Sequence, residues 1–463
     1  MRLPPAFLER MGGLLGSELE RFVESFAEPR SRALRVNPQK TDVEELRRLL
    51  GVELRPLPWG ELGFEIVGEA PGLGSHPAHL AGLFYLQEPS SLSVAEIVRP
   101  EPGWRIADVA AAPGGKTSHL ASLVGDGGLV LANEVRPARL AVLHENVDRW
   151  GSPSVVTGGL SLEALAAAVE EPFDAVVLDA PCTGEALFRR DPKLVREWSA
   201  GAVRGAARRQ AGLLADAAMI VRPGGVLVYS TCSFELEENE QNVAGFLARN
   251  PDWSLEDAVL FEGLRPGCRV NGYATDLTAR LWPHQGPGEG QFVARLRRSE
   301  QADAGGRPGR PSRRRDGSRS VAVARLWRQF AERVVPDLAA ADDRLVVRGD
   351  SILLAPERSP GVAPDALARA GTPLGTARPG RFEPAHALAT SLLGRLVGPR
   401  VSWTADDPRL RGYLRGETVP SPGPDGWVLV CYERWGIGWG RRTGGVIKNF
   451  FPRRLRVHGP QAY

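Results

Sequence analysis

The sequence predicts an α/β protein built around a doubly wound, mostly parallel β-sheet. Between residues 104 and 231, short apolar runs alternate with helical segments, as in parallel strands joined by crossover helices. A glycine-rich turn directly follows the first of these runs. The chain has 463 residues, about three times the length of an average domain, so two to four domains are expected.

Before this sheet, the first 70 residues predict a small α+β module. We expect helices over residues 18–26 and 42–50 and strands over residues 33–37 and 52–57. The pattern changes at about residue 104, where the alternating segment begins.

The central sheet is expected to contain five parallel strands. Their apolar runs are at residues 106–109, 129–132, 155–156, 175–178 and 226–229. Two later runs, at residues 281–282 and 292–296, are separated by HQGPGEG and predict a closing antiparallel hairpin. In the strand order 3-2-1-4-5, the fourth and fifth strands are neighbours whose ends face one ligand crevice.

The rest of the chain begins with a segment dense in Gly, Pro, Ser and Arg at residues 301–320, which has the composition of a linker. Short apolar runs with glycine-rich turns near the C-terminus predict a small β-rich module. After Glu433 this module has no acidic residue and seven basic ones: Arg434, Arg441, Arg442, Lys448, Arg453, Arg454 and Arg456. Four aromatic residues lie among them: Trp435, Trp439, Phe450 and Phe451. Such a mixture suits RNA, the alternative being core aromatics beneath a solvated basic face.

Composition excludes several classes of protein. Apolar residues make up 43% and charged residues 24%, as is usual for a folded globular chain. No apolar run approaches the roughly 20 residues that span a bilayer, and the N-terminus lacks the apolar core of a signal peptide. The cysteines and histidines are scattered and form no disulfide framework or metal motif. We therefore expect a cytoplasmic protein without a metal and without a membrane partner.

The basic residues are almost all arginine. Of 58 Lys and Arg side chains, only Lys40, Lys116, Lys193 and Lys448 are lysine, a surplus that codon bias of a GC-rich genome explains. Under that bias, a remaining lysine can mark a position that needs a compact ammonium instead of a planar guanidinium. An arginine-rich surface also suits a partner that carries phosphates.

The glycine-rich turn, ADVAAAPGGKT, allows more than one interpretation. GGKT resembles a phosphate-binding loop, and the later VVLDAP resembles a magnesium-binding strand, which together would indicate a P-loop ATPase. Such a loop, however, needs glycine where Ala110 stands and normally lacks a proline such as Pro113. The alternative is a Rossmann-type cofactor turn, in which Gly114 and Gly115 let the backbone approach a ligand.

The position of Glu134 favours the interpretation of this turn as a cofactor site. It follows the second strand, about 20 positions after the glycines, where a carboxylate accepts hydrogen bonds from ribose hydroxyls. An NAD site would need the GxGxxG spacing, which is missing here. S-adenosylmethionine (SAM) needs the ribose acceptor but no pyrophosphate site. We therefore favour SAM, with a nucleotide or a purely structural turn as alternatives.

Two cysteines and an aspartate end the fourth and fifth strands. Asp179 and Cys182 follow the fourth strand and Cys232 follows the fifth, so these side chains should gather opposite the cofactor turn. A thiolate that adds to C6 of a pyrimidine makes C5 nucleophilic enough to take a methyl group. Asp179 can form a hydrogen bond with N3 or N4 of the pyrimidine. A general base must then remove the proton from C5. We interpret Cys268 and Cys431 as small buried hydrophobes.

These motifs together resemble the NOL/NOP/SUN family of RNA cytosine-5 methyltransferases. The resemblance covers about residues 30–298 and rests on RVN, LQEPSS, DVAAAPGGKT, NE, LDAPCTGE, RPGGVLVYSTCSFELEENE and WPH–GEG–F. It implies a Rossmann-like SAM-dependent methyltransferase core in which Cys232 is the nucleophile and Cys182 assists product release. It also implies cofactor contacts from Ala110, Ala111, Ala112, Pro113, Gly114, Gly115, Lys116, Glu134 and Asp179.

Two positions depart from that family's pattern. An aspartate near the adenine usually follows the third strand, where spacing from Asp179 selects Ser161 here. Gln291 stands where an aromatic residue or histidine is commoner in the GEG–F turn.

The C-terminal tail is similar to the extension of bacterial small-subunit rRNA methyltransferases, which includes a PUA-like RNA-binding module. The resemblance implies methylation of C5 of cytosine in 16S rRNA, free or in the small subunit, by a monomeric enzyme. Alternatives are tRNA or 23S rRNA as substrate, or a non-catalytic RNA-binding protein of ribosome assembly. We expect an N-terminal α+β RNA-binding module (1–95), the methyltransferase domain (96–298), a linker (299–320), a small domain (321–395) and the PUA-like module (396–463).

Some polar residues near these motifs are expected to be structural. His284, in WPH, lies closest to the crevice of the seven histidines, and we favour a structural role for it. Glu237, Glu238 and Glu240 suit the N-terminus of a helix after Cys232, although they also leave a carboxylate near the thiol.

Overall fold

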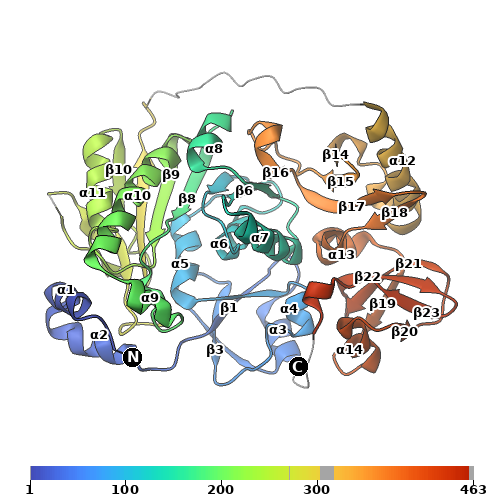
Figure 1. Ribbon diagram of the computed structural model, residues 1–463, viewed down its shortest axis with the longest axis horizontal. Coiled ribbons are helices and arrows are strands. Elements are labelled where there is room, and N and C mark those ends of the chain that lie inside the picture. Colours follow the sequence, from blue (N-terminus) through green and yellow to red (C-terminus); the bar gives the residue numbers. More distant parts are fainter. Residues whose placement is uncertain (1, 271, 303–316, 458–463) are drawn as a thin grey trace.

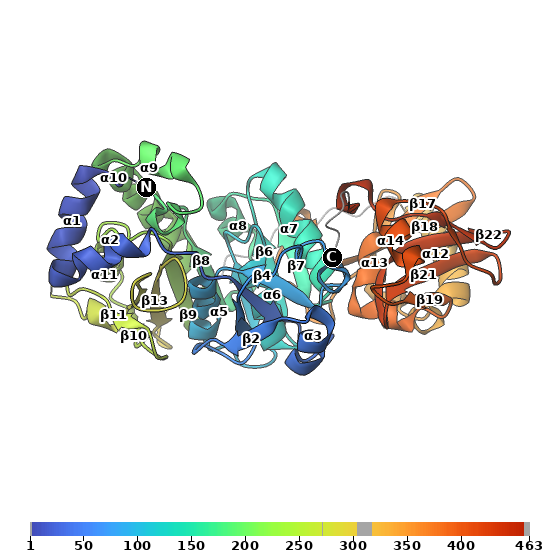
Figure 2. The same ribbon diagram turned by 90° about the horizontal axis from the view of Figure 1, so that it is seen from below.

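The computed structural model describes residues 2–270, 272–302 and 317–457. Most of the predicted linker falls on residues 303–316, which lie outside the described residues. The central α/β domain lies between helices α1 and α2 at one end and the C-terminal modules at the other, as Figures 1 and 2 show. Among the helices of the described ranges, none is long and apolar enough to cross a membrane.

The N-terminal part is an α+β module around a four-stranded antiparallel sheet of order β2-β3-β1-β4. Its elements are α1 (Pro5–Leu15), η1 (Gly16–Glu18), α2 (Leu19–Ser25), β1 (Ala33–Val36), α3 (Val43–Leu50), β2 (Glu53–Pro56), β3 (Gly63–Val67), α4 (Pro77–Leu80) and β4 (Phe84–Gln87). Both predicted helices and both predicted strands are confirmed. Helix α1 is not apparent in the sequence because Gly12 and Gly13 lower its helix propensity. It is stabilised by packing, since Phe7 is buried against Phe188 and Trp198.

The doubly wound sheet of the central domain is confirmed. Its parallel strands are β5 (Arg105–Asp108), β6 (Leu129–Asn133), β7 (Val155–Gly158), β8 (Phe173–Asp179) and β9 (Val221–Thr231). They follow the order β7-β6-β5-β8-β9, which is the predicted 3-2-1-4-5. The antiparallel closing strands are also confirmed, with β12 (Ala279–Leu281) on β13 (Gln291–Arg298) and β13 on β9. Short strands β10 (Trp253–Glu256) and β11 (Arg265–Pro266) complete this edge.

Helices cover both faces of this sheet. One face carries α5 (Pro89–Val98), α6 (Gly115–Val124) and α7 (Pro137–Trp150), and the other carries α8 (Leu162–Ala168), α10 (Ala200–Ala218) and α11 (Glu240–Arg249). Alternate strand residues enter the two resulting cores: Val226 and Val228 pack on one face, Leu227 and Tyr229 on the other. Because both faces are buried, the strands read as continuous apolar runs. The remaining elements are η2 (Glu185–Leu187) and α9 (Pro192–Glu197), which follow β8, and η3 (Thr275–Leu277), which precedes β12.

The C-terminal region contains two further sheets. The first module has α12 (Gly317–Val334), β14 (Leu345–Arg348), β15 (Ser351–Leu354), β16 (Leu367–Arg369), β17 (Thr372–Arg378), β18 (Arg381–Pro384) and α13 (His386–Thr390). The last has β19 (Arg400–Trp403), α14 (Pro408–Arg415), β20 (Val419–Pro420), β21 (Gly426–Tyr432), β22 (Trp435–Thr443) and β23 (Val446–Asn449). Its five-stranded sheet confirms the predicted β-rich module.

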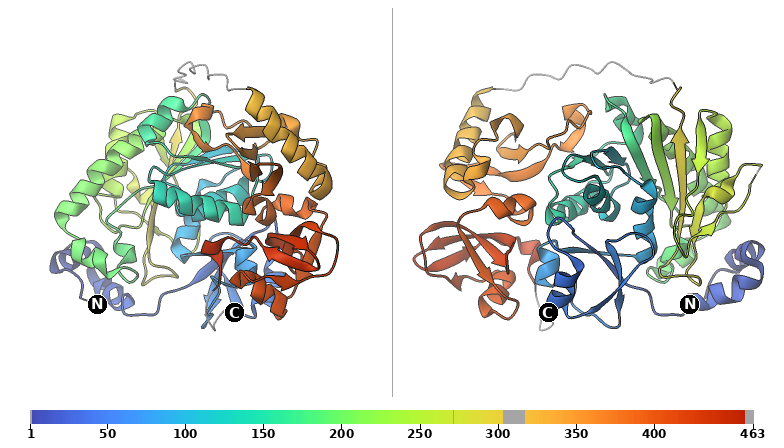
Figure 3. Two further views of the ribbon diagram at one scale, coloured as in Figure 1. Left: turned by 45° about the vertical axis from the view of Figure 1, so that its right-hand side comes forward. Right: turned by 180° about the vertical axis from the view of Figure 1, so that it is seen from behind.

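These modules are not independent of the rest of the chain. Strand β16 leaves the first C-terminal module and pairs antiparallel with β7 at the edge of the central sheet. Apolar residues of the last module, such as Tyr413 and Trp435, share one core with Leu34 and Phe84 of the N-terminal module. The right-hand view of Figure 3 shows the N-terminal module and the last module side by side, seen from behind. Residues more than 300 positions apart therefore build one folded unit.

Lys40 connects three of these parts. Its buried Nζ donates to three backbone carbonyls: those of Ala81 (2.8 Å), Arg149 (2.9 Å) and Thr390 (2.7 Å). Three converging acceptors match the three N–H donors of an ammonium, whereas a planar guanidinium cannot direct its donors in this way. This position therefore has a physical reason to keep lysine in a chain that otherwise uses arginine.

Replacing Lys40 by Met should lower the free energy of unfolding by about 1–3 kcal/mol, because buried carbonyls lose their donor. Lys40→Arg should also destabilise, since its donors point in other directions. The midpoint of denaturant unfolding, followed by tryptophan fluorescence, measures the effect. Lys193→Met, at an exposed lysine, is the control, and equal midpoints for Lys40→Met and Lys193→Met would contradict this role.

Candidate active site

The glycine-rich turn connects β5 to α6 and has the backbone conformation its sequence predicts. Gly114 caps α6 with a φ of 110°, a region that residues with a Cβ rarely adopt. The Ala112–Pro113 peptide bond is cis. Neighbouring elements hold the turn, because Asn146 Nδ2 donates to the Pro113 carbonyl at 2.8 Å and Arg35 Nη2 to the Gly115 carbonyl at 3.2 Å.

A cavity of about 450 Å³ lies beside this turn, within the range of roughly 300–1,000 Å³ that is usual for small-molecule sites. Seven of the predicted cofactor residues line it: Ala110, Ala111, Ala112, Pro113, Gly115, Lys116 and Asp179. Two further residues also line the cavity: Cys232, which follows β9, and Gln291, which begins β13. The cavity thus places the turn and one predicted catalytic thiol around the same space.

Three donors converge on Asp179 inside this cavity. Lys116 Nζ lies 2.8 Å from Oδ2, while Ser230 Oγ and Gln291 Nε2 donate to Oδ1 at 2.8 and 3.3 Å. Burial opposes the charge of Lys116, but the contact with Asp179 outweighs it and raises the pKa of Lys116 above its usual value. Lys116 is therefore an ammonium that holds one carboxylate oxygen at the cavity wall.

The two predicted catalytic cysteines contact each other. Cys182 Sγ lies 3.1 Å from Cys232 Sγ. Only Cys232 lines the cavity, and Cys182 lies outside its lining. The contact with Cys232, together with burial, raises the pKa of Cys182 well above its usual value. Cys182 is therefore a thiol that keeps its proton.

A buried carboxylate pair supports the loop that carries Cys182. The hydroxyl of Thr183 contacts both Glu185 and Glu238, and its backbone N–H donates to Glu238 at 3.2 Å. Trp198 Nε1 donates to Glu185 at 2.8 Å, and Gln210 Nε2 to Glu238 at 2.6 Å. Burial raises the pKa of both carboxyl groups. A carboxylate is present near the thiols, as expected, but its hydrogen bonds serve to hold the loop that carries Cys182 in place.

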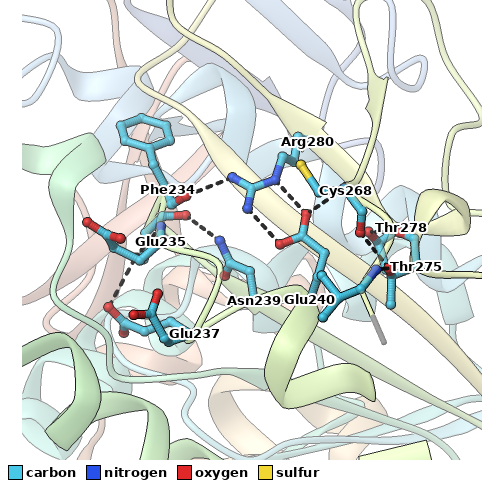
Figure 4. Close-up of polar contacts among 12 residues, drawn as sticks. Phe234, Glu235, Glu237, Asn239, Glu240, Cys268, Thr275, Thr278 and Arg280 are labelled. Atoms are coloured by element: carbon cyan, nitrogen blue, oxygen red, sulfur yellow. Dashed lines mark hydrogen bonds and ion pairs between the residues drawn. The ribbon is translucent and has the colours of Figure 1, made fainter. Parts of the chain in front are cut away.

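Ion pairs hold the segment after Cys232, and Figure 4 shows the one between Arg280 and Glu240. Arg280 donates to both oxygens of Glu240 at 2.7 Å and to the Phe234 carbonyl at 3.0 Å, and all these groups are buried. Of the three glutamates expected to open a helix here, only Glu240 begins α11. Glu237 pairs with Arg10 at 2.5 Å, and Glu238 belongs to the carboxylate pair. The helix-terminus prediction is therefore wrong for Glu237 and Glu238, because side chains distant in sequence provide their partners.

Other predicted residues lie outside the cavity lining. Gly114 belongs to the turn but does not line the cavity. Glu134 lies one residue beyond β6, where it accepts from the Arg136 N–H at 2.9 Å and lies 3.4 Å from Arg139. Ser161 caps α8 by accepting from the Ala164 N–H at 3.3 Å. His284 is buried 3.1 Å from Glu18 and packs against Phe22 and Trp282, which agrees with a structural role. In the described residues, no group of three or more His, Cys, Asp or Glu side chains is arranged to hold a metal.

Three residues of the site were not assigned from the sequence. Gln87 lines the cavity with a buried Oε1 that has no partner among the described residues. Its neighbour Glu88 accepts from the Ser91 and Glu289 N–H groups at 2.8 and 2.6 Å and so attaches the GEG turn to α5. Gln87 and Glu88 belong to the LQEPSS motif, which was the signal in the sequence that could have identified them. The role of Ser230 beside Asp179 required the strand pairing.

Four family profiles together cover nearly the whole described chain. Residues 95–297 match 16S rRNA methyltransferase RsmB/F, and residues 3–89 match the N-terminal domain of 16S rRNA methyltransferase RsmF. Residues 329–392 match the first C-terminal domain of RsmF rRNA methyltransferase, and residues 401–457 match the PUA domain of methyltransferase RsmF.

Full-length relatives and solved structures agree with these profiles. The chain is 33% identical to ribosomal RNA small subunit methyltransferase F of Erwinia tasmaniensis and 34% identical to that of Serratia proteamaculans. Each alignment covers 98% of this chain and 96% of the relative. The crystal structure of a methyltransferase homologue from Pyrococcus horikoshii has a TM-score of 0.57 and 32% identity, over 63% of this chain and 94% of that chain. The structure of NSun6 from the same organism has a TM-score of 0.56 and 24% identity, over 64% and 98%. It shares the fold.

The two ion pairs after Cys232 should differ in strength. Glu240→Gln should lower the free energy of unfolding by about 3–5 kcal/mol, because it leaves the buried Arg280 unpaired. Glu237→Gln should cost about 1 kcal/mol or less, since its ion pair with Arg10 is partly exposed. Denaturant unfolding of the two variants measures this difference. Equal losses of unfolding free energy in the two variants would show that both glutamates stabilise the protein only through their charge near the N-terminus of α11.

Proposed function

The chain belongs to the RsmF family of 16S rRNA methyltransferases, and we propose that it forms 5-methylcytosine through a covalent adduct on Cys232, with SAM as methyl donor. One observation carries the assignment of the thiol: Cys232 faces the cavity, whereas Cys182, 3.1 Å away, does not. The raised pKa of Cys182 keeps that thiol protonated, so the cavity-facing Cys232 is the attacking group in this proposal.

The cavity fits SAM by its size and by its donor and acceptor groups. The Ala110–Lys116 turn would hold the cofactor, and the unpartnered Gln87 Oε1 offers an acceptor for its ammonium group. Glu134 would exchange its contact with Arg139 for the ribose hydroxyls, with Ser161 as the weaker contact near the adenine. When bound, SAM supplies an electrophilic methyl group.

The proposed attack begins at the cavity end of β9. The Cys232 thiolate forms a bond to C6 of cytosine, the C5–C6 π bond breaks, and its electron pair is shared between C5 and N3, which makes C5 nucleophilic. Asp179, which already accepts from Ser230 and Gln291, accepts a hydrogen bond from the N4 amine. Lys116 can donate to the ring as negative charge develops there. C5 then takes the methyl group.

Cys182 is suited to the release step. The largest cause of its raised pKa is the contact with Cys232. Once Cys232 has become a thioether, this cause is removed, and Cys182 can release its proton to solvent and act as the base. The Cys182 thiolate takes the C5 proton, the C5–C6 double bond re-forms, and Cys232 leaves as a thiolate. This order gives the neighbouring thiols two different roles.

The substrate assignment is tested with methyl-labelled SAM and RNA from a strain that lacks this protein. Label should enter unmodified 16S rRNA and map to C5 of cytosine. Transfer RNA and 23S rRNA are the comparison substrates. Preferential labelling of either, or methylation at N4 or a ribose hydroxyl, would contradict the proposal.

Cys232→Ala should reduce methyl transfer by roughly 10³-fold or more, because the adduct cannot form. Its affinity for SAM, measured by calorimetry, should be unchanged. Cys268→Ala is the matched control, since that thiol lies outside the cavity lining and should retain activity. Near wild-type methyl transfer by Cys232→Ala would show that another group attacks.

Cys182→Ala should accumulate enzyme crosslinked to RNA, seen as a shifted band on a denaturing gel. In a single turnover, methyl transfer should persist. Normal turnover without an adduct would refute the release role.

A further inference from the structure

A second, larger groove lies between the two C-terminal modules, at the opposite end of the molecule from α11 (Figure 1). It has a volume of about 660 Å³ and is formed by α12, β18 and the loops and strands around β21 and β22. Its lining contains one acidic residue, Asp425, and five arginines: Arg333, Arg381, Arg400, Arg441 and Arg442. The groove is therefore strongly basic, and two successive modules of the chain contribute to it.

Two of these arginines differ from the other three in having no side-chain partner among the described residues. Arg333, at the end of α12, and Arg441, on β22, are exposed and have no hydrogen-bond or ion-pair partner among the described residues. Arg442 is buried and shapes the rim by donating to the Ser421 hydroxyl and the Pro424 carbonyl, both at 3.2 Å. An anionic ligand would supply the missing partners of Arg333 and Arg441.

An aromatic platform stands beside these arginines. Trp427 lines the groove, and its ring centroid lies 4.6 Å from that of Phe450, which is 39% exposed. The aromatic residues of the tail expected to stack on RNA are otherwise unsuitable, because Trp435, Trp439 and Phe451 are buried in the core. That expectation is wrong for these three residues, since they pack in the cores that the last module shares with other parts of the chain.

Several of the remaining basic residues of the tail serve to attach it. Arg434 forms an ion pair with Glu45, and Arg454 lies 2.9 Å from Glu145. These contacts join the last module to α3 and α7. The uncompensated charge and the accessible ring thus coincide in the groove between the modules.

We propose that this groove binds a single-stranded segment of RNA, with phosphates on Arg333 and Arg441 and a base against Trp427. Cations interleaved with an aromatic ring face are the combination that binds single strands, whose bases are free to stack. The proposal rests on the proposed function only in taking RNA as the substrate. It adds a binding site outside the catalytic cavity, and it assigns half of that site to the module before the PUA domain.

The test uses the full-length enzyme and a fluorescently labelled single-stranded fragment of unmodified 16S rRNA, measured by anisotropy. Arg333→Glu combined with Arg441→Glu should weaken binding at least tenfold and lower the log–log salt slope by about 0.7 for each lost phosphate contact. The matched control, Arg208→Glu with Arg249→Glu, makes the same charge change at exposed positions of α10 and α11. It should have a much smaller effect.

A milder set of variants separates binding from folding and from catalysis. Arg333→Ala with Arg441→Ala should raise KM for RNA and leave kcat, SAM affinity and thermal unfolding unchanged. Trp427→Ala should weaken binding roughly tenfold with little change in salt slope, and Trp427→Phe should restore most of it.

Affinity and salt slope equal to those of the control pair would overturn the proposal, and so would an equal loss of binding to a duplex of the same length. Unchanged affinity for naked RNA with impaired methylation of assembled small subunits would assign the groove to a ribosomal protein instead. A wild-type enzyme that binds RNA through the groove but transfers no methyl group would contradict the proposed function alone.

Discussion

The parallel pairing of β8 with β9 is the constraint on which the site depends. Its register sets Asp179 opposite Ser230, and the two loops that leave these strands bring Cys182 within 3.1 Å of Cys232. A shift of one residue would turn every side chain of one strand to the other face and separate the thiols. The buried carboxylates Glu185 and Glu238 then keep the two loops in contact. The contact between the two thiols follows from this alignment.

The N-terminal module completes the cavity. Arg35 is buried, stacks on Trp150 with 4.2 Å between the guanidinium carbon and the ring centroid, and donates to Ser118 at 2.6 Å. Glu88 begins α5 and at the same time holds the GEG turn of the closing hairpin. The motifs RVN and LQEPSS thus act mainly on the backbone that surrounds the cavity. They bring a separate sheet against the cofactor turn.

The C-terminal modules are integrated into the fold in a similar way. Strand β16 extends the central sheet, the last module completes the core of the N-terminal module, and Lys40 binds carbonyls from three parts of the chain. Removing the tail would expose this core, so loss of RNA binding after truncation would not separate recognition from folding. Point substitutions in the groove between the modules avoid that difficulty.

Local patterns in the sequence determined the architecture and the composition of the site. Continuous apolar runs indicated buried parallel strands, their order followed from the doubly wound topology, and the strand ends then brought Asp179, Cys182 and Cys232 together. Those inferences need only the neighbours along the chain and one general rule of sheet topology. Tertiary structure alone decided that Cys232 faces the cavity, that Glu240 pairs with Arg280, that α1 forms, and that Arg333 and Arg441 share a groove. Each of these depends on side chains far apart in sequence, whose burial and charge pairing are set only when the modules pack against one another.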